Sequence, residues 1–284
     1  MKFFIYPNLS KANAAVCVEK IIKTLIFKDN EIYVDKRYKK ELDFYYGLKF
    51  IGTDELDNSF DYAIALGGDG TILECAKAIM KYDLKLIGIN TGRLGFMSSL
   101  ESNEIDSLDK IGRGQFRISE RMMLDGEISG RDSENEVCSL NDIVIYEKMS
   151  KMIEFEVFLG KNPVGKYHAN GVIFSTPTGS TAYALSAGGP IISPEMKCIE
   201  MTLICPHSLF ARPIIFSPDD ILRVKLNLRD GHEVFLTADG ESEIPLEVSN
   251  SVTIKKSDKS VSLINFGYNT FFDSLDKKFM HPIK

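Results

Sequence analysis

The sequence predicts two domains, an α/β domain with a parallel sheet followed by an all-β domain with an antiparallel sandwich. In the first hundred residues, short continuous apolar runs alternate with amphipathic stretches, which is the pattern of parallel strands joined by helices. From residue 116 onward, apolar and polar residues alternate in runs that Gly, Asn, Asp and Pro interrupt, as in antiparallel strands. The length of 284 residues also favours two domains.

The expected elements of the first domain alternate between strand and helix. Ser10 is placed to cap a helix whose apolar stripe runs to about Phe27. The charged residues 36–41 indicate a surface segment. Strands joined by helices in this order form a Rossmann-like sheet. The expected strands are residues 3–6, 31–34, 62–66 and 86–89, and the expected helices begin at residues 10 and 71.

The expected elements of the second domain are strands. Residues 222–228 alternate strictly between apolar and polar side chains. Asp230-Gly231 is a hairpin signal that would join them to a return strand at residues 234–237. The other expected strands are residues 153–159, 172–174, 252–255 and 261–264.

The character of the sequence changes near Met97. We therefore expect the first domain to span residues 1–97 and the second to span residues 98–264, with one short helix between residues 98 and 110. The last segment, residues 265–284, is rich in Phe and more helix-like than strand-like. We expect it to pack back on the first domain.

Composition and charge limit the classes of function that the protein can have. The net charge of −6 excludes the basic face that nucleic acid or an anionic membrane would attract. Five dispersed cysteines without a C-x-x-C pair favour reduced thiols in the cytoplasm over disulfides or a zinc site. No apolar run is long enough to span a membrane. The sequence also contains neither a G-x-S-x-G elbow nor a P-loop motif, so covalent hydrolysis and a P-loop mechanism have no support.

A glycine-rich turn at residues 67–71 carries the strongest chemical signal of the first domain. Its sequence, Gly-Gly-Asp-Gly-Thr, follows an apolar strand, and its glycines allow positive φ and the close approach of a ligand. Thr71 and Glu74 have the spacing of a capping box, so a helix is expected to begin here. The N–H groups of a helix start suit phosphates, and Asp69 is suited to hold a metal or to accept a proton. The alternative is a tight strand-to-helix turn with an Asp near the helix start.

A second polar cluster interrupts the β pattern at residues 175–190. Its hydroxyls gather where Ser180 or Thr181 would cap a short helix that Gly188 and Gly189 end, and they suit a polar ligand such as a nucleoside. The alternative is a capped helix packed on a sheet through its alanines. Residues 141–142, an Asn-Asp pair, offer an amide beside a carboxylate, although such a pair is also usual in a turn.

Five separated motifs together resemble the NAD kinase family. They are GGDGT at 67–71, NTGRLGF at 90–96, LND at 140–142, STPTGSTAYALSAGGP at 175–190 and CPHSLFARP at 205–213, in the order of that family. The resemblance implies that ATP, or polyphosphate in some members, phosphorylates the adenosine-ribose 2′-hydroxyl of NAD to give NADP. It further implies a divalent cation, Mg²⁺ or Mn²⁺, together with ATP, and a homodimer or homotetramer.

The same resemblance implies roles for residues that match the motifs by position. Asp69 matches the residue thought to activate the acceptor hydroxyl. The phosphate-side loop matches Gly67, Gly68, Gly70 and Thr71. The residues expected to contact NAD are Phe96, Asn141, Asp142, Asn170, Thr178, Thr181, Ala182, Tyr183 and Ser186. No position is assigned as a metal ligand.

Asn170 departs from the family pattern, which commonly has Asp there in contact with the nicotinamide end. Asn keeps the size and one acceptor but loses the charge, and the Coulomb attraction at contact is on the order of 1–4 kcal/mol in a wet site. We therefore expect relaxed discrimination between NAD and NADH. Two alternatives to a NAD kinase stay open, a lipid kinase that shares the GGDGT loop and a NAD-binding sensor without turnover.

Overall fold

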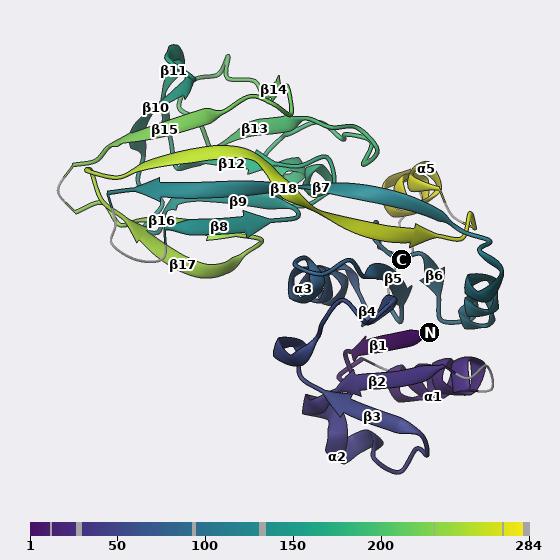
Figure 1. The fold of residues 1–284 in the computed structure, drawn as a ribbon. Helices are drawn as coiled ribbons and strands as arrows, with labels where there is room; N and C mark the ends of the chain where they lie inside the picture. The colour runs from purple at the N-terminus through teal and green to yellow at the C-terminus, as the bar shows by residue number, and fades with distance from the viewer. Residues whose placement is uncertain are drawn as a thin grey trace. The chain divides into compact units, whose positions relative to one another are not determined.

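The chain folds into two compact units. The computed structural model describes residues 1–11, 13–26, 30–92, 95–130, 135–229, 231–268 and 270–280. The first unit, here the α/β unit, comprises Met1–Glu120 and Val261–Lys284, and the second, here the β unit, comprises Arg121–Ser260 (Figure 1). The first unit extends beyond residue 97 because η3 (Ile105–Arg113) buries three apolar residues in its core. The domain bounds 1–97 and 98–264 stay predictions.

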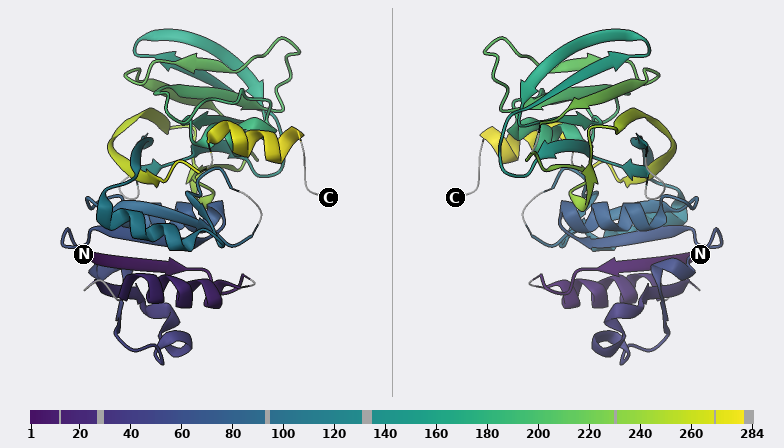
Figure 2. Two further views of the ribbon diagram at one scale, coloured as in Figure 1. Left: turned by 90° about the vertical axis from the view of Figure 1, so that its right-hand side faces the viewer. Right: turned by 90° about the vertical axis from the view of Figure 1, so that its left-hand side faces the viewer.

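The α/β unit contains the expected parallel sheet. Its strands are ordered β3–β2–β1–β4–β5, every neighbouring pair is parallel, and β1 lies inside the sheet (Figure 2). β5 also pairs in parallel with β6 and with the end of β18 (Ser251–Asn265). The strands are β1 (Lys2–Pro7), β2 (Glu31–Asp35), β3 (Leu48–Ile51), β4 (Tyr62–Gly67), β5 (Lys85–Asn90) and β6 (Leu100–Glu101).

Helical segments cover the two faces of this sheet. Phe3 and Ile5 of β1 belong to one cluster with α1 and η3, whereas Gly88 of β5 lies against Ile72 of α3. Both faces of the strands are therefore buried, which explains their continuous apolar runs. The helical segments are α1 (Ala14–Ile26), η1 (Lys36–Tyr38), α2 (Lys39–Leu42), η2 (Thr53–Glu55), α3 (Asp69–Ile79), η3 (Ile105–Arg113), α5 (Phe271–Leu275) and the π-helical turn η5 (Asp276–Met280).

The first helix begins later than expected. Ser10 does not cap it, because its N–H and hydroxyl both donate to Asn8 Oδ1, at 3.2 and 2.6 Å. α1 begins at Ala14, directly after Asn13, which has a φ of 65°. Phe27, where we expected the helix to end, lies outside the described residues.

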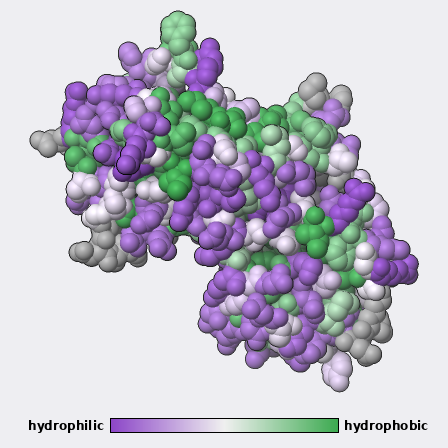
Figure 3. Space-filling view, turned by 45° about the horizontal axis from the view of Figure 1, so that its top comes forward, coloured by the Kyte–Doolittle hydropathy of each residue, from purple (hydrophilic) through white to green (hydrophobic). Residues whose placement is uncertain are grey.

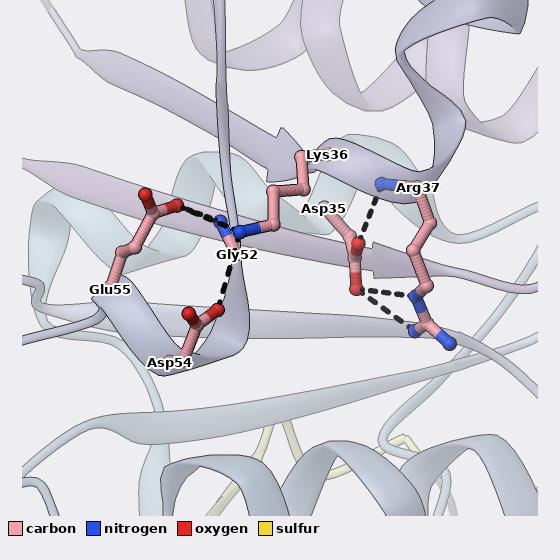
Figure 4. Close-up of polar contacts among 6 residues, drawn as sticks. All are labelled: Asp35, Lys36, Arg37, Gly52, Asp54 and Glu55. Carbon is pink, nitrogen blue, oxygen red and sulfur yellow. Dashed lines mark hydrogen bonds and ion pairs between the residues drawn. The ribbon is translucent and has the colours of Figure 1, made fainter.

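Polar contacts hold the carboxyl end of β2. Asp35 is buried, and its carboxylate accepts from the backbone N–H of Arg37 at 2.9 Å and from its Nε at 3.0 Å (Figure 4). Lys36 Nζ lies 3.4 Å from Asp54 Oδ1 and 3.4 Å from Glu55 Oε2, so it joins η2 to the end of β2. The charged stretch after β2 is thus tied to the edge of the sheet.

The β unit contains two antiparallel sheets around one core, as expected. One sheet has the order β11–β10–β15–β18, where β7 pairs with β18 and β8 pairs with β7, and the other has the order β14–β13–β12–β9–β16–β17. Phe155 and Val224 of the first sheet and Phe174 and Leu236 of the second are fully buried in the shared core. Hydrophilic residues dominate the face seen in Figure 3, with hydrophobic residues in smaller patches.

The strands of this unit are β7 (Arg117–Ser129), β8 (Glu136–Ser139), β9 (Asp142–Glu147), β10 (Ile153–Leu159), β11 (Asn162–Ala169), β12 (Gly171–Ser175), β13 (Ile199–Ile204), β14 (Ile214–Phe216), β15 (Leu222–Asn227), β16 (Val234–Ala238), β17 (Glu241–Leu246) and β18. Its helical segments are η4 (Gly179–Thr181) and α4 (Tyr183–Ser186). β18 is one strand where two were expected. None of the helices among the described residues of either unit has the length and apolar character of a membrane span.

The predicted hairpin between residues 222–228 and 234–237 is wrong. Both strands form, but β15 pairs with β10 and β18, whereas β16 pairs with β9 and β17 in the other sheet. Asp230 of the predicted turn lies outside the described residues. A turn signal is local, whereas the partner of a strand depends on which sheet buries its apolar face.

Candidate active site

The glycine-rich turn leads directly from β4 into α3. The strand ends at Gly67, Gly68 is the N-cap residue with a φ of −96°, and α3 begins at Asp69. None of Gly67, Gly68 and Gly70 has positive φ, so the turn does not use that freedom of its glycines. A Cβ on Gly67 would overlap the side chain of Thr71, whereas Gly68 and Gly70 face open space to 4 Å. These two glycines leave the start of α3 accessible to a ligand.

The expected capping box at this helix start is also wrong. α3 begins two residues before Thr71, so the threonine lies in the first turn of the helix. Its hydroxyl accepts from Asn8 Nδ2 at 3.3 Å, and Glu74 accepts from the Tyr6 hydroxyl at 3.2 Å. Both side chains are thus used in contacts with β1 and the residue after it, and the first N–H groups of α3 receive no side-chain cap.

The carboxylate of Asp69 is held by the loop after β5. Its Oδ2 accepts from the backbone N–H of Phe96 at 3.0 Å, and its Oδ1 accepts from that of Met97 at 3.1 Å. A Cβ on Gly95 would overlap the carboxylate, so the loop needs a glycine there to approach this closely. Arg93 and Leu94 of the same motif lie outside the described residues. The structure therefore brings two sequence-predicted residues together, and Asp69 stays about one-third exposed, at 34%.

The C-terminal segment contacts the same carboxylate. Lys278 Nζ lies 3.5 Å from Asp69 Oδ2 and 4.1 Å from the centre of the Phe96 ring. The Phe96 ring centre also lies 5.8 Å from that of Phe271 and 6.0 Å from that of Phe279. The sequence motifs did not point to Lys278. The cluster of phenylalanines in the last twenty residues is the signal that this segment covers an apolar surface.

The β unit carries a cavity of about 430 Å³ between β9, the residues before α4 and the turn that joins β16 to β17. Four of the residues expected to contact NAD line it. They are Asn141, Asp142, Ala182 and Tyr183. The lining residues that we did not expect are Val144, Tyr146, Thr237, Asp239, Gly240 and Glu243.

Asp239 fixes one wall of this cavity. Its Oδ2 accepts from the N–H of Leu140 at 3.0 Å, and its Oδ1 accepts from the N–H groups of Asn141 and Asp142 at 2.7 and 3.2 Å. Asp239 has a φ of 54°, a conformation that Asp tolerates better than most residues. An Asp-Gly pair between two alternating runs is the sequence signal that could have identified this turn.

The segment after β12 packs its backbone against the same wall. The Thr176 hydroxyl donates to the Leu140 carbonyl at 2.6 Å and accepts from the Gly179 N–H at 3.1 Å. A Cβ on Gly179 would overlap the carbonyl oxygen of Asn141, so this position requires glycine. The Asn-Asp pair is therefore held from two sides, by this turn and by Asp239.

The short helix of this segment is not capped as expected. The N-cap residue of α4 is Ala182, and no side chain caps it. The Ser180 hydroxyl is buried, donates to the Pro177 carbonyl at 2.8 Å and accepts from the Ile192 N–H at 3.0 Å. Three further residues expected to contact NAD belong to this segment but do not line the cavity. They are Thr178, Thr181 and Ser186.

Asn170 lies outside the cavity and has a local structural role. Its Nδ2 donates to the carbonyl oxygens of Ser150 and Lys151, at 2.7 and 3.0 Å. Ser150 has a φ of 56°, so these bonds hold a turn that few residues would adopt alone. An Asp at this position has no N–H to donate.

Within the described residues, no group of three or more His, Cys, Asp and Glu side chains could hold a metal ion. Asp69 is a single carboxylate, and both of its oxygens already accept backbone N–H groups. The described residues around Asp69 therefore do not form a complete metal site by themselves.

An Asp at an open helix start suits a protein that handles phosphates, and a cavity lined by carboxylates, an amide and tyrosine rings suits one that binds a nucleoside. Together they fit a kinase that acts on a nucleotide. The model of the ATP-NAD kinase N-terminal domain matches residues 5–116, and that of the ATP-NAD kinase C-terminal domain matches residues 140–266. The NAD kinase of Thermoanaerobacter sp. (strain X514) is 38% identical over 281 residues, which are 98% of each chain. That of Clostridium botulinum (strain ATCC 19397 / Type A) is 37% identical over 235 residues, 81% of this chain and 83% of that one. The chain belongs to the NAD kinase family.

Solved structures share the fold. Yeast NADH kinase complexed with NADH superimposes with a TM-score of 0.87 at 23% identity, over 100% of this chain and 88% of that one. An NAD kinase from Archaeoglobus fulgidus in complex with ATP superimposes with a TM-score of 0.73 at 22% identity, over 100% and 99%. At these identities the two structures support the architecture and nothing finer.

Proposed function

We propose that this protein is an NAD kinase, which transfers the terminal phosphoryl group of ATP to NAD and forms NADP. Family membership along 98% of the chain supports the activity. The observation that carries the assignment of the site is Asp69, whose carboxylate stands at the open start of α3 and is oriented by two backbone N–H groups. The same family membership favours this reading over a lipid kinase.

The donor phosphates would lie at the start of α3. The phosphate side then consists of Gly67, Gly68, Gly70 and Thr71, where free N–H groups and the positive end of the helix dipole favour an anion. A divalent cation such as Mg²⁺ or Mn²⁺, bound to the phosphates of ATP, would offset part of their charge. ATP, and not polyphosphate, is the donor that we propose.

Asp69 would act as the general base. Its carboxylate accepts the proton of the ribose 2′-hydroxyl while the hydroxyl oxygen forms a bond to the γ-phosphorus and the bond to the ADP oxygen breaks. The N–H groups of Phe96 and Met97 keep both carboxylate oxygens oriented during this step. The reaction therefore requires that the 2′-hydroxyl be brought within hydrogen-bond distance of Asp69.

The cavity of the β unit would hold the adenosine part of NAD. Asn141 and Asp142 offer an amide and a carboxylate for the ribose and base, and Tyr183, which is 47% exposed, offers a ring on which a base can stack. Ala182 completes this wall. We keep Phe96, Thr178, Thr181 and Ser186 as further contacts with NAD, on the strength of the motif match alone.

We also propose that the protein accepts NADH as well as NAD, because Asn170 brings no negative charge to the nicotinamide end. The variant Asn170→Asp, which restores the charge, tests this proposal. It also loses the two hydrogen bonds to the carbonyl oxygens of Ser150 and Lys151, so its stability has to be measured as well. We expect the variant to raise the preference for NAD, as the ratio of the two kcat/KM values, by at least about fivefold, and to melt at a lower temperature. Asn170→Ala, which loses the bonds without adding charge, is the control. Identical ratios in the wild type and Asn170→Asp would contradict the proposal.

We also propose a cytoplasmic location and a homo-oligomeric assembly. All five cysteines are free, which supports a reducing compartment such as the cytoplasm. A homodimer or homotetramer is proposed from the family resemblance. Sedimentation velocity of the whole chain, with and without NAD, tests the assembly, and a single monomeric species at both conditions would contradict it.

A coupled assay for NADP formation from NAD, ATP and Mg²⁺ tests the activity, run beside a melting-temperature shift with NAD. We expect turnover together with a higher melting temperature. A shift without turnover under varied donors and cations would identify a NAD-binding sensor instead. The absence of both signals would mean that the acceptor is not NAD, and lipid acceptors would then be assayed.

A further inference from the structure

The C-terminal segment places a cation against the carboxylate that we propose as the general base. Lys278 Nζ lies 3.5 Å from Asp69 Oδ2, and the two side chains are 31% and 34% exposed. A pair with this exposure contributes little to the stability of a fold. Its position at the open start of α3 therefore suggests that the cation serves the reaction.

The packing of the segment fixes where Lys278 lies. The Phe96 ring is in contact with the rings of Phe271 and Phe279, and the Lys278 ammonium lies 4.1 Å from the centre of the Phe96 ring. The backbone N–H of Phe96 donates to Asp69 at 3.0 Å. One residue of the loop after β5 thus contacts both the ammonium and the carboxylate.

The segment itself has a defined start. The Thr270 hydroxyl accepts from the Asp273 N–H at 3.1 Å, and the Asp273 carboxylate accepts from the Thr270 N–H at 2.7 Å, which is a complete capping box. Ser274 is buried. Lys278 is therefore presented by a capped and packed segment.

The reaction proposed above needs a positive charge at this place. A polyanionic donor has to approach Asp69 in a chain with a net charge of −6 and no P-loop lysine. Fixed cations next to the transferred group lower the barrier because they offset charge that is shared by the phosphoryl oxygens in the transition state. Backbone N–H groups alone carry only the partial charge of a helix start.

We propose that Lys278 is a further catalytic residue, whose ammonium donates hydrogen bonds to the transferred phosphoryl group. This inference rests on the proposed function. Lys278 gives up no proton in the step, because the proton of the acceptor hydroxyl goes to Asp69 and the bond to the ADP oxygen breaks as the new bond to phosphorus forms. In the structure the ammonium pairs with Asp69, next to the place proposed for the donor phosphates.

The test compares three variants of the full chain. Lys278→Met removes the charge and keeps the length, Lys278→Arg keeps the charge, and Lys277→Met is the matched control one residue away in the same turn. We expect Lys278→Met to lower kcat by about 10²-fold with the KM for NAD unchanged, and Lys278→Arg to regain part of the loss. Lys277→Met should keep the wild-type kcat. The melting temperatures of all three should equal that of the wild type.

A second measurement needs no turnover, namely the rise in melting temperature with MgATP. We expect a smaller rise in Lys278→Met than in Lys277→Met. The inference is wrong if both variants show the same rise and a kcat within about twofold of each other. It is also wrong if Lys278→Met loses activity only because its melting temperature or its KM for NAD has changed. A wild type that forms no NADP but shows a Lys278-dependent rise with MgATP would contradict the proposed function and the catalytic role, and would support only a contact between Lys278 and the donor phosphates.

Discussion

The turn that carries Asp69 and the cavity of the β unit are built in opposite ways. The turn is one uninterrupted stretch from β4 into α3, and its glycines and carboxylate are neighbours in the sequence. The wall of the cavity depends on Asp239, which accepts from backbone N–H groups 97 to 99 residues earlier in the chain. The reactive residues of the turn are therefore neighbours in the sequence, whereas the shape of the cavity depends on strands from the whole β sandwich.

Because of this difference, substitutions in the turn and in the cavity wall should affect different properties of the protein. The carboxylate of Asp69 is one-third exposed and accepts the N–H groups of one loop, so its replacement should lower turnover far more than stability. Asp239 holds the backbone of residues 140–142, so its replacement should change stability and NAD binding together. The predictions below measure whether the two effects can be separated in this way.

Asp69→Asn should have the largest effect. The amide does not accept the proton of the hydroxyl, so we expect kcat to fall by about 10²–10⁴-fold with the fold retained. Steady-state kinetics of NADP formation, combined with the melting-temperature shift with NAD, measure both parts. An unchanged shift is the control that NAD still binds. Near-normal turnover would contradict the assignment of Asp69 as the base.

Asp239→Asn should have a smaller effect, and on two quantities at once. Asn tolerates the φ of 54° but keeps a single, neutral acceptor oxygen, and its NH2 group would face an N–H that the carboxylate accepts. We expect a loss of about 2 kcal/mol in the free energy of unfolding, together with a severalfold higher KM for NAD. Denaturant unfolding and initial rates measure these.

The control for this variant is Asp258→Asn, at an exposed position of β18 in the same unit. It should match the wild type in both measurements. A higher KM for NAD in Asp239→Asn without any loss of stability would contradict the view that the cavity wall and the sandwich are one structure.

The same contrast explains which features the sequence could predict. The continuous apolar runs of β1, β4 and β5 and the alternation in β10 and β15 depend only on local pattern and on burial, and they predicted the sheets correctly. The start of α3 was misplaced because Asp69 itself occupies the first turn, where the Thr71 and Glu74 spacing suggested a later start.

Long-range partners were not predictable from local pattern. β16 joins β9 and not β15, because the choice depends on which sheet buries its apolar face. Asp239 and Lys278 act on residues 97 to 99 and 209 positions away, respectively, and no single stretch of sequence contains either pair. The motifs identified the residues of each site that lie within a motif. They did not identify Asp239 and Lys278, which lie near these residues only in the folded chain.

The smallest predicted effect concerns Glu200, a residue of β13 that is fully buried behind the segment with α4. A Cβ on Gly189 would overlap its Oε1, which accepts from the Thr202 hydroxyl at 2.7 Å, and its Oε2 has no hydrogen-bond partner in the described part of the chain. Burial raises the pKa of the Glu200 carboxyl above its ordinary value of 4.5. The folded protein therefore binds this proton more tightly than the unfolded chain does.

The sign of the pH dependence follows from that raised pKa. The stabilising contribution of protonated Glu200 is complete below the ordinary value and is lost as the pH rises through the raised pKa. Glu200→Gln keeps an acceptor for Thr202 and never ionises. We therefore expect it to match the wild type near pH 4 and to exceed it by on the order of 1 kcal/mol near pH 8, or about 2–4 °C in melting temperature. Turnover at pH 8 should be unchanged, because Glu200 does not line the cavity. Glu233→Gln, at an exposed position, is the control. A stability difference for Glu200→Gln that is constant between about pH 4 and pH 8 would mean that ionisation of this residue does not affect folding.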